Sequence, residues 1–142
     1  MLDRSNLTAL TPDNFPTFER EAFEGIKLSA KKYETILNIV QHWDENDVKW
    51  VACTDEEVIQ ALSQIKGVGN WTIDMMLIYT LNRPNAFAYD DFHIKQIMTS
   101  LYDLNPKSKL KAQMKAISEP WSPFKATAFQ YLIAWKKFTQ SK

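Results

Sequence analysis

The stretch that decides the fold runs from residue 62 to residue 75 and reads LSQIKGVGNWTIDM. Two of the chain's three glycines, Gly67 and Gly69, frame a short turn within it. Glycine adopts backbone conformations that a Cβ disfavours, and it lets another backbone approach closely. A second helix is expected from Asn70, where unpaired N–H groups and the helix dipole could bind an anion such as a phosphate. A glycine-capped corner between two helices would look the same, so the turn alone leaves both interpretations open.

The hydrophobic pattern on both sides of this turn is helical. Apolar residues recur with the i, i+3, i+4, i+7 spacing of a helix face in the ranges 33–40, 58–65, 94–101 and 124–135. Residues 72–81 are apolar enough to form a buried strand. Their Met- and Leu-rich composition and the lack of a clear partner strand favour a buried helix instead. The sequence therefore predicts an all-α protein.

Polar residues mark the expected helix starts. Residues 54–57, Thr-Asp-Glu-Glu, read as a capping box that starts a helix near 54–65. Asn70 and the adjacent pair Asp90 and Asp91 are interpreted as further N-caps. A pair of aspartates offers more than one cap requires. One can cap while the other points into a cleft, where it could stabilise positive charge on a sugar and orient a water.

Composition favours one globular domain over residues 1–142. The chain is 45% hydrophobic and has five Trp, which is enough for a core. The single Cys53 cannot form an internal disulfide or hold a metal site alone. No apolar run approaches the roughly 20 residues that span a bilayer, and the N-terminus lacks an apolar signal core. We therefore expect a soluble cytoplasmic protein without membrane partners.

Charge is distributed unevenly along the chain, although the formal net charge is zero. Residues 1–100 hold 9 Lys/Arg against 15 Asp/Glu, whereas residues 101–142 hold 8 against 2. A basic C-terminal third could face phosphates. A solvated lysine-rich helix surface would give the same distribution.

Four segments, residues 25–32, 62–75, 90–96 and 121–128, together resemble one family, the helix-hairpin-helix DNA glycosylases. Residues 62–75 resemble the hairpin of that family, and residues 90–96, DDFHIKQ, resemble the segment with its catalytic aspartate. Residues 121–128, WSPFKATA, are similar to the Trp-x-Pro-aromatic-Arg-Ser-x-Ala signature of the 3-methyladenine DNA glycosylase II branch. Residues 25–32, GIKLSAKK, resemble the Gly-Leu-Ser-x-x-Lys segment of that branch. The matches follow family order and spacing over about residues 11–135.

The resemblance implies the family's helical fold, with the hairpin at about 54–82, the catalytic loop and its helix at about 87–103, and basic helices at about 107–139. It also implies a monofunctional DNA N-glycosylase that removes alkylated bases such as 3-methyladenine in base excision repair. Asp91 matches the catalytic aspartate, which would stabilise the oxocarbenium-like sugar and activate a water.

Strand cleavage is not expected from this resemblance. Trp71 occupies the place where bifunctional members carry a nucleophilic lysine, and no lysine follows the hairpin glycines until Lys95.

The resemblance also implies a bacterial protein that is associated with the nucleoid. Further roles carried over from the family concern the partner, double-stranded DNA with a damaged base. The residues expected at the base pocket are Trp71, Met75 and Asp90. Those expected at the DNA backbone are Gly67, Gly69, Asn70, Thr72 and Lys125. No cofactor is required, but the family hairpin binds Na⁺ or K⁺ through backbone carbonyls, which here would be those of Ser63, Ile65 and Val68. His93 matches a histidine of other branches and is expected to be a surface or packing residue.

The chain departs from the family pattern in three respects. Met75 replaces an aromatic residue, and Lys125 replaces the signature arginine, whose forked geometry a lysine lacks. Family enzymes also have roughly another half-domain before the region equivalent to Thr11, so the domain is expected to be incomplete at its N-terminus. Apolar surface left on helix 72–81 would then predict homo-oligomers. The alternatives are a catalytically incomplete DNA-binding module, a fragment of a longer glycosylase, or a helical interaction protein that does not bind DNA.

Overall fold

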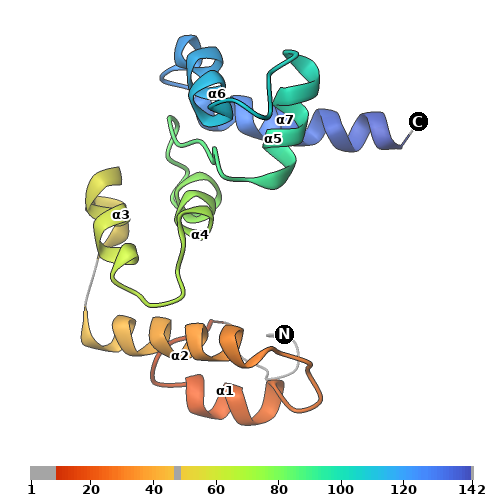
Figure 1. The fold of residues 1–142 in the computed structure, drawn as a ribbon. Coiled ribbons are helices and arrows are strands. Elements are labelled where there is room, and N and C mark those ends of the chain that lie inside the picture. Colours follow the sequence, from red (N-terminus) through yellow and green to blue (C-terminus); the bar gives the residue numbers. More distant parts are fainter. Residues whose placement is uncertain (1–8, 47–48, 142) are drawn as a thin grey trace. The chain divides into compact units, whose positions relative to one another are not determined.

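A computed structural model describes residues 9–46 and 49–141, and every regular element in these ranges is a helix (Figure 1). The prediction of an all-α protein is thereby confirmed. None of the helices in these ranges is long and apolar enough to cross a membrane. The α-helices are α1 (Phe15–Ala22), α2 (Ala30–Glu45), α3 (Asp55–Ser63), α4 (Asn70–Met75), α5 (Phe92–Leu101), α6 (Leu110–Ser118) and α7 (Lys125–Gln140). Short 3-10 helices lie at Trp50–Ala52 and Glu119–Trp121, and a π-helical turn lies at Met76–Thr80.

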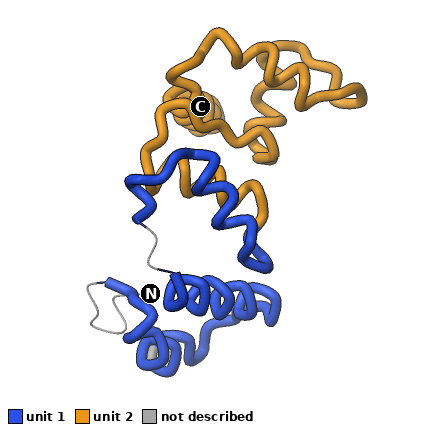
Figure 2. Tube along the Cα trace, turned by 90° about the vertical axis from the view of Figure 1, so that its left-hand side faces the viewer, with its two compact units in different colours: residues 1–68 blue, residues 69–142 orange. Residues whose placement is uncertain are grey.

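The chain packs as two compact units, residues 1–68 and residues 69–142 (Figure 2). The boundary falls between Val68 and Gly69, inside the predicted hairpin. The assignment of a single domain over 1–142 therefore stays a prediction, and each unit is described by itself.

The core of the first unit lies between α1 and α2. Phe15, Phe18 and Ala22 of α1 are buried, and Ile36 and Val40 of α2 pack against them. These two residues belong to the apolar stripe predicted over 33–40, so that helix is confirmed.

Helix α3 begins as the sequence predicts. The Glu57 N–H donates to the Thr54 hydroxyl at 3.2 Å, and the Thr54 N–H donates to the Glu57 carboxylate at 2.8 Å. This reciprocal pair is the predicted capping box. The helix ends at Ser63, two residues earlier than expected.

The glycine turn that follows α3 is held against α2. Gly67 has φ +96°, in the left-handed region that favours glycine, and a Cβ there would collide with the Thr35 side chain. The Asn38 side-chain amide donates to the Lys66 carbonyl at 3.0 Å. Glycine is therefore required at position 67 both by backbone conformation and by space.

Helix α4 opens the second unit and continues into the π-helical turn. Ile73, Leu77 and Ile78 are buried, which confirms the buried helix predicted over 72–81. The prediction that Asn70 caps this helix is wrong. Gly69 occupies the N-cap with an extended backbone, φ −100° and ψ 173°, and Asn70 is already the first helical residue.

The core of the second unit forms where α5 packs against α6 and α7. Ile94, Ile97 and Met98 of α5 are buried, and Phe129 of α7 meets Phe87 edge to face at 5.5 Å between ring centroids. This core fixes the N-terminal end of α5, where the paired aspartates lie.

Candidate active site

Asp91 lies at the start of α5 and is only 7% exposed. Its Oδ1 accepts a hydrogen bond from the Ile94 backbone N–H at 2.9 Å, so it caps the helix. Its Oδ2 accepts one from the Trp71 indole Nε1–H at 2.7 Å. Both oxygens are thus held by N–H donors, and the dipole of α5 adds a favourable interaction for negative charge. The arrangement orients a carboxylate that can stabilise a developing cation.

Trp71 reaches Asp91 from the second position of α4 and remains 51% exposed. The residue is therefore both an exposed aromatic surface and the donor that fixes the carboxylate. Only the first of these roles, a wall of the base pocket, was predicted. The hydrogen bond spans 20 residues of sequence, and no local pattern indicates it.

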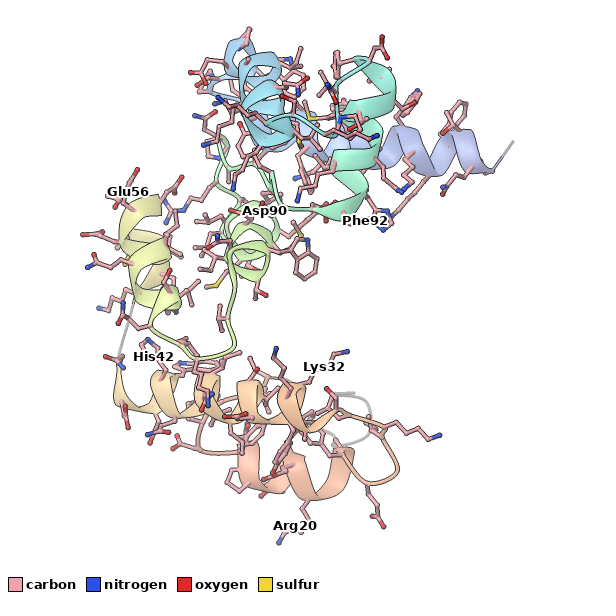
Figure 3. The ribbon with its side chains drawn as sticks, viewed as in Figure 1. Arg20, Lys32, His42, Glu56, Asp90 and Phe92 are labelled. Carbon is pink, nitrogen blue, oxygen red and sulfur yellow. The ribbon has the colours of Figure 1, made fainter. Side chains whose placement is uncertain are left out.

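Asp90 has a different environment from its neighbour, although both belong to the segment marked by Asp90 and Phe92 in Figure 3. Its Oδ2 lies 2.9 Å from the Lys111 ammonium, and its Oδ1 lies 3.7 Å from that of Lys95. The hydrogen bond from Lys111, with the positive charges of both lysines, holds the pKa of Asp90 below its usual range. The expected division, with one aspartate capping and the other facing a cleft, is not found. Asp91 makes the cap itself, and Asp90 binds lysines.

Asp74 is a third carboxyl of this region that the sequence reading missed. It lies half-buried in α4, and burial, followed by the negative charge of Asp90, raises its pKa to about 6 despite the opposing effect of Lys111. A signal was present in the sequence, since Asp74 is the single charged residue within the apolar run 72–81.

The other predicted site residues differ in accessibility. Met75 is half-buried in α4, and its grouping with Trp71 and Asp90 around a base stays a prediction. The four residues predicted at the DNA backbone in or beside the hairpin are Gly67, Gly69, Asn70 and Thr72. All four are exposed, and Gly69, Asn70 and Thr72 lie at the start of α4.

Lys125, the fifth residue predicted at the DNA backbone, is placed differently. Its side chain is 13% exposed, and its ammonium lies 3.0 Å from the Glu119 carboxylate. A phosphate contact by Lys125 stays a prediction, and it would require this ion pair to open.

Known proteins resemble the chain both in sequence and in fold. No protein-family model matches the sequence. The chain is 32% identical, over 130 residues, to DNA-3-methyladenine glycosylase 1 of Schizosaccharomyces pombe, a match that covers 89% of the chain and 56% of that relative. A solved structure of a 3-methyladenine DNA glycosylase from the same yeast, in complex with abasic DNA, aligns with a TM-score of 0.75 and 29% identity. That alignment covers 92% of the chain and 67% of the solved one.

A second solved structure, a DNA-3-methyladenine glycosidase from Bacillus halodurans, shares the fold with a TM-score of 0.74. Its sequence identity is 22%, and the alignment covers 92% of the chain and 61% of the solved one. These similarities in sequence and fold support the resemblance to the helix-hairpin-helix DNA glycosylase family. The chain spans about half the length of the first curated relative that it matches.

Proposed function

We propose that the chain is a monofunctional DNA N-glycosylase that excises alkylated bases such as 3-methyladenine. One observation carries the proposal: a buried carboxylate, Asp91, is oriented by the Trp71 indole and by the start of α5. The names of the relatives, DNA-3-methyladenine glycosylases, support alkylated bases as the substrate class.

The proposed reaction breaks the bond between the deoxyribose and the damaged base. When the bond between the deoxyribose C1′ and the base nitrogen breaks, its electron pair departs with the base and positive charge develops on the sugar. A cationic alkylated base leaves as a neutral molecule, so little acid assistance is needed. The Asp91 carboxylate stabilises the cationic sugar and orients the water that adds to C1′ and then loses a proton. Glycosidases use carboxylates in the same way.

Cleavage of the DNA strand is not part of this proposal. A lyase step requires an amine that attacks C1′ and forms an imine. Trp71, at the position where bifunctional members carry lysine, offers no such amine, and its N–H is engaged by Asp91. Lys95, the next lysine along the chain, lies 3.7 Å from Asp90.

The proposed partner is double-stranded DNA from which the damaged nucleotide is flipped, because a stacked base hides its glycosidic bond. Backbone N–H groups at Gly67, Gly69, Asn70 and Thr72 are proposed to contact phosphates, which fixes register without reading sequence. The exposure of all four residues supports the proposal.

A structural Na⁺ or K⁺ at the turn is also proposed. The carbonyls of Ser63, Ile65 and Val68 are neutral oxygen donors. The Ile65 carbonyl accepts the Val68 N–H at 3.1 Å, which leaves its second lone pair for an ion. Such a set fits a monovalent cation. Among the described residues no group of three or more His, Cys, Asp or Glu side chains could hold a metal. Bound, the ion would stabilise the turn.

The test is release of 3-methyladenine from methylated duplex DNA by the chain, by Asp91→Asn and by Asp90→Asn. The Asp91→Asn side chain would keep an oxygen to accept the Ile94 N–H but lose the charge, so we expect at least ~100-fold slower release, as for other well-placed electrostatic groups. Asp90→Asn is the matched control, and because Lys95 and Lys111 bind that carboxylate we expect only a small loss. The product strand should stay intact until it is treated with alkali.

Each outcome has a clear meaning. Full activity in Asp91→Asn would refute the catalytic assignment. If no variant releases base while all bind duplex DNA, the chain is instead a DNA-binding module.

A further inference from the structure

One lysine of the second unit differs from its neighbours in what it contacts. The ammonium groups of Lys95, Lys111 and Lys125 all lie within 3.7 Å of a carboxylate. Among the described residues, the hydrogen-bond partners of the Lys136 ammonium are the ring Nδ1 of His93 at 2.8 Å and the side-chain oxygen of Gln96 at 3.0 Å. Both partners are neutral acceptors, so they orient the ammonium without neutralising its charge.

The hydrogen bonds also set the state of His93. An ammonium can only donate, so Nδ1 accepts and the ring proton is assigned to Nε2. The pair therefore retains one full positive charge on Lys136 and an N–H donor on His93. An anion is the partner that would complete this arrangement.

A surface hollow of about 150 Å³ lies at this pair and is lined by His93, Ile133, Lys136, Lys137 and Gln140. Sites for drug-sized molecules are about 300 Å³ or more, so this hollow suits a smaller group. It has the volume of about five water molecules at ~30 Å³ each. That size suits one phosphate group, and two lysines beside it suit its charge.

The hollow is also close to the proposed catalytic residue along the chain. His93 follows Asp91 by two residues and lies in the first turn of α5, where the helix dipole favours anions. Phe92, between them, is 67% exposed, and its ring centroid lies 5.6 Å from that of His93 (Figure 3). A nucleotide whose sugar faces Asp91 is flanked by backbone phosphates, so an anion site near the start of α5 suits the proposed substrate.

We propose that His93, Lys136 and Lys137 bind a backbone phosphate of the DNA strand that carries the damaged base. The inference rests on the proposed function, because it takes the partner to be that DNA. It assigns the phosphate contact of the basic C-terminal third to Lys136, whose charge is available, rather than to Lys125, whose charge is paired with Glu119.

The experiment measures binding of a duplex with a tetrahydrofuran abasic-site analogue, which cannot be turned over, between roughly 50 and 200 mM NaCl. Lys136→Met keeps the aliphatic stem and removes the charge. Losing one phosphate contact should flatten the slope of log K against log salt by about 0.9, so the affinity ratio of wild type to variant should shrink about 3- to 4-fold across this range. Lys136→Arg should keep the wild-type slope. Lys107→Met removes an exposed lysine charge from the loop between α5 and α6 and is the matched control.

The results separate this inference from the function it rests on. A Lys136→Met slope equal to that of Lys107→Met would overturn the phosphate site while wild-type base release still stands. A wild-type chain that neither binds this duplex nor releases base would overturn both proposals. Circular dichroism of each variant shows whether its helices are intact, and if Lys136→Met unfolds, the slope of Lys136→Gln, which also removes the charge, decides in its place.

Discussion

Asp74→Asn should stabilise the protein at neutral pH. Asp74 is half-buried in α4, and burial together with the negative charge of Asp90 raises its pKa from 3.8 to about 6. The fold therefore favours the protonated carboxyl. The contribution of this group to stability is complete below pH 3.8 and is lost as the pH rises through 6. Asparagine has a similar shape and stays uncharged at every pH.

The size of the effect follows from the two pKa values. Their difference corresponds to about 3 kcal/mol at about 1.36 kcal/mol per pKa unit. Because the carboxyl is half-exposed, solvent screens part of this, and we expect a gain of about 1–2 kcal/mol at about pH 7.5. At about pH 4.5 the carboxyl is still mostly protonated in the folded protein, so the expected gain in stability falls to roughly a third of its value at the higher pH.

Urea denaturation of wild type and Asp74→Asn at both pH values measures the difference. Asp13→Asn, at an exposed position, controls for the loss of one negative charge. Equal stability of wild type and Asp74→Asn at the higher pH, or a gain that is larger at the lower pH, would show that the fold does not favour the protonated acid.

Two further predictions concern the orienting tryptophan and the glycine turn. Trp71→Phe keeps an aromatic ring and removes the N–H that donates to Asp91. The rate of base release should fall about 10- to 100-fold, as expected for the loss of a hydrogen bond to a charged group, while the melting temperature changes little. An unchanged rate would exclude an orienting role for Trp71. Gly67→Ala should lower the free energy of unfolding by at least about 1–2 kcal/mol, because φ is +96° and the new methyl meets Thr35. At Gly69, φ is −100° and no atom lies within 4 Å of the position of a Cβ, so Gly69→Ala should lower the free energy of unfolding by less. Equal losses of unfolding free energy for the two variants in urea denaturation would contradict this account.

Local sequence signals predicted the helices well where a side chain acts on its own backbone. The capping box at Thr54 and the cap at Asp91 depend on atoms three residues away, so both could be predicted from sequence. The cap at Asn70 was misassigned because the extended residue before the helix is glycine, which leaves no side-chain signal. The π-helical turn at Met76–Thr80 also has no signature in the apolar run that contains it.

The site was predicted less completely, because its contacts join residues far apart in sequence. Asp91 could be found from its position after the hairpin, but its link to Trp71 and the lysines around Asp90 depend on how α4, α5 and α6 pack. The charge distribution indicated a basic C-terminal third but could not show which lysines are neutralised. Lys125 is paired with Glu119, whereas Lys136 faces a histidine and an amide.

The two hydrogen bonds of Asp91 limit how this position can drift in evolution. One oxygen accepts the Ile94 N–H at the start of α5, and the other accepts the Trp71 indole N–H. Most substitutions of Asp91 would therefore weaken both the helix start and the proposed reaction. If the proposed base excision were lost in a lineage, asparagine or serine at this position could still keep the helix start, since both are good N-caps. Among distant homologues, such a replacement would be expected in proteins that keep the scaffold for another task, whereas a large apolar residue would remove the cap of α5 as well.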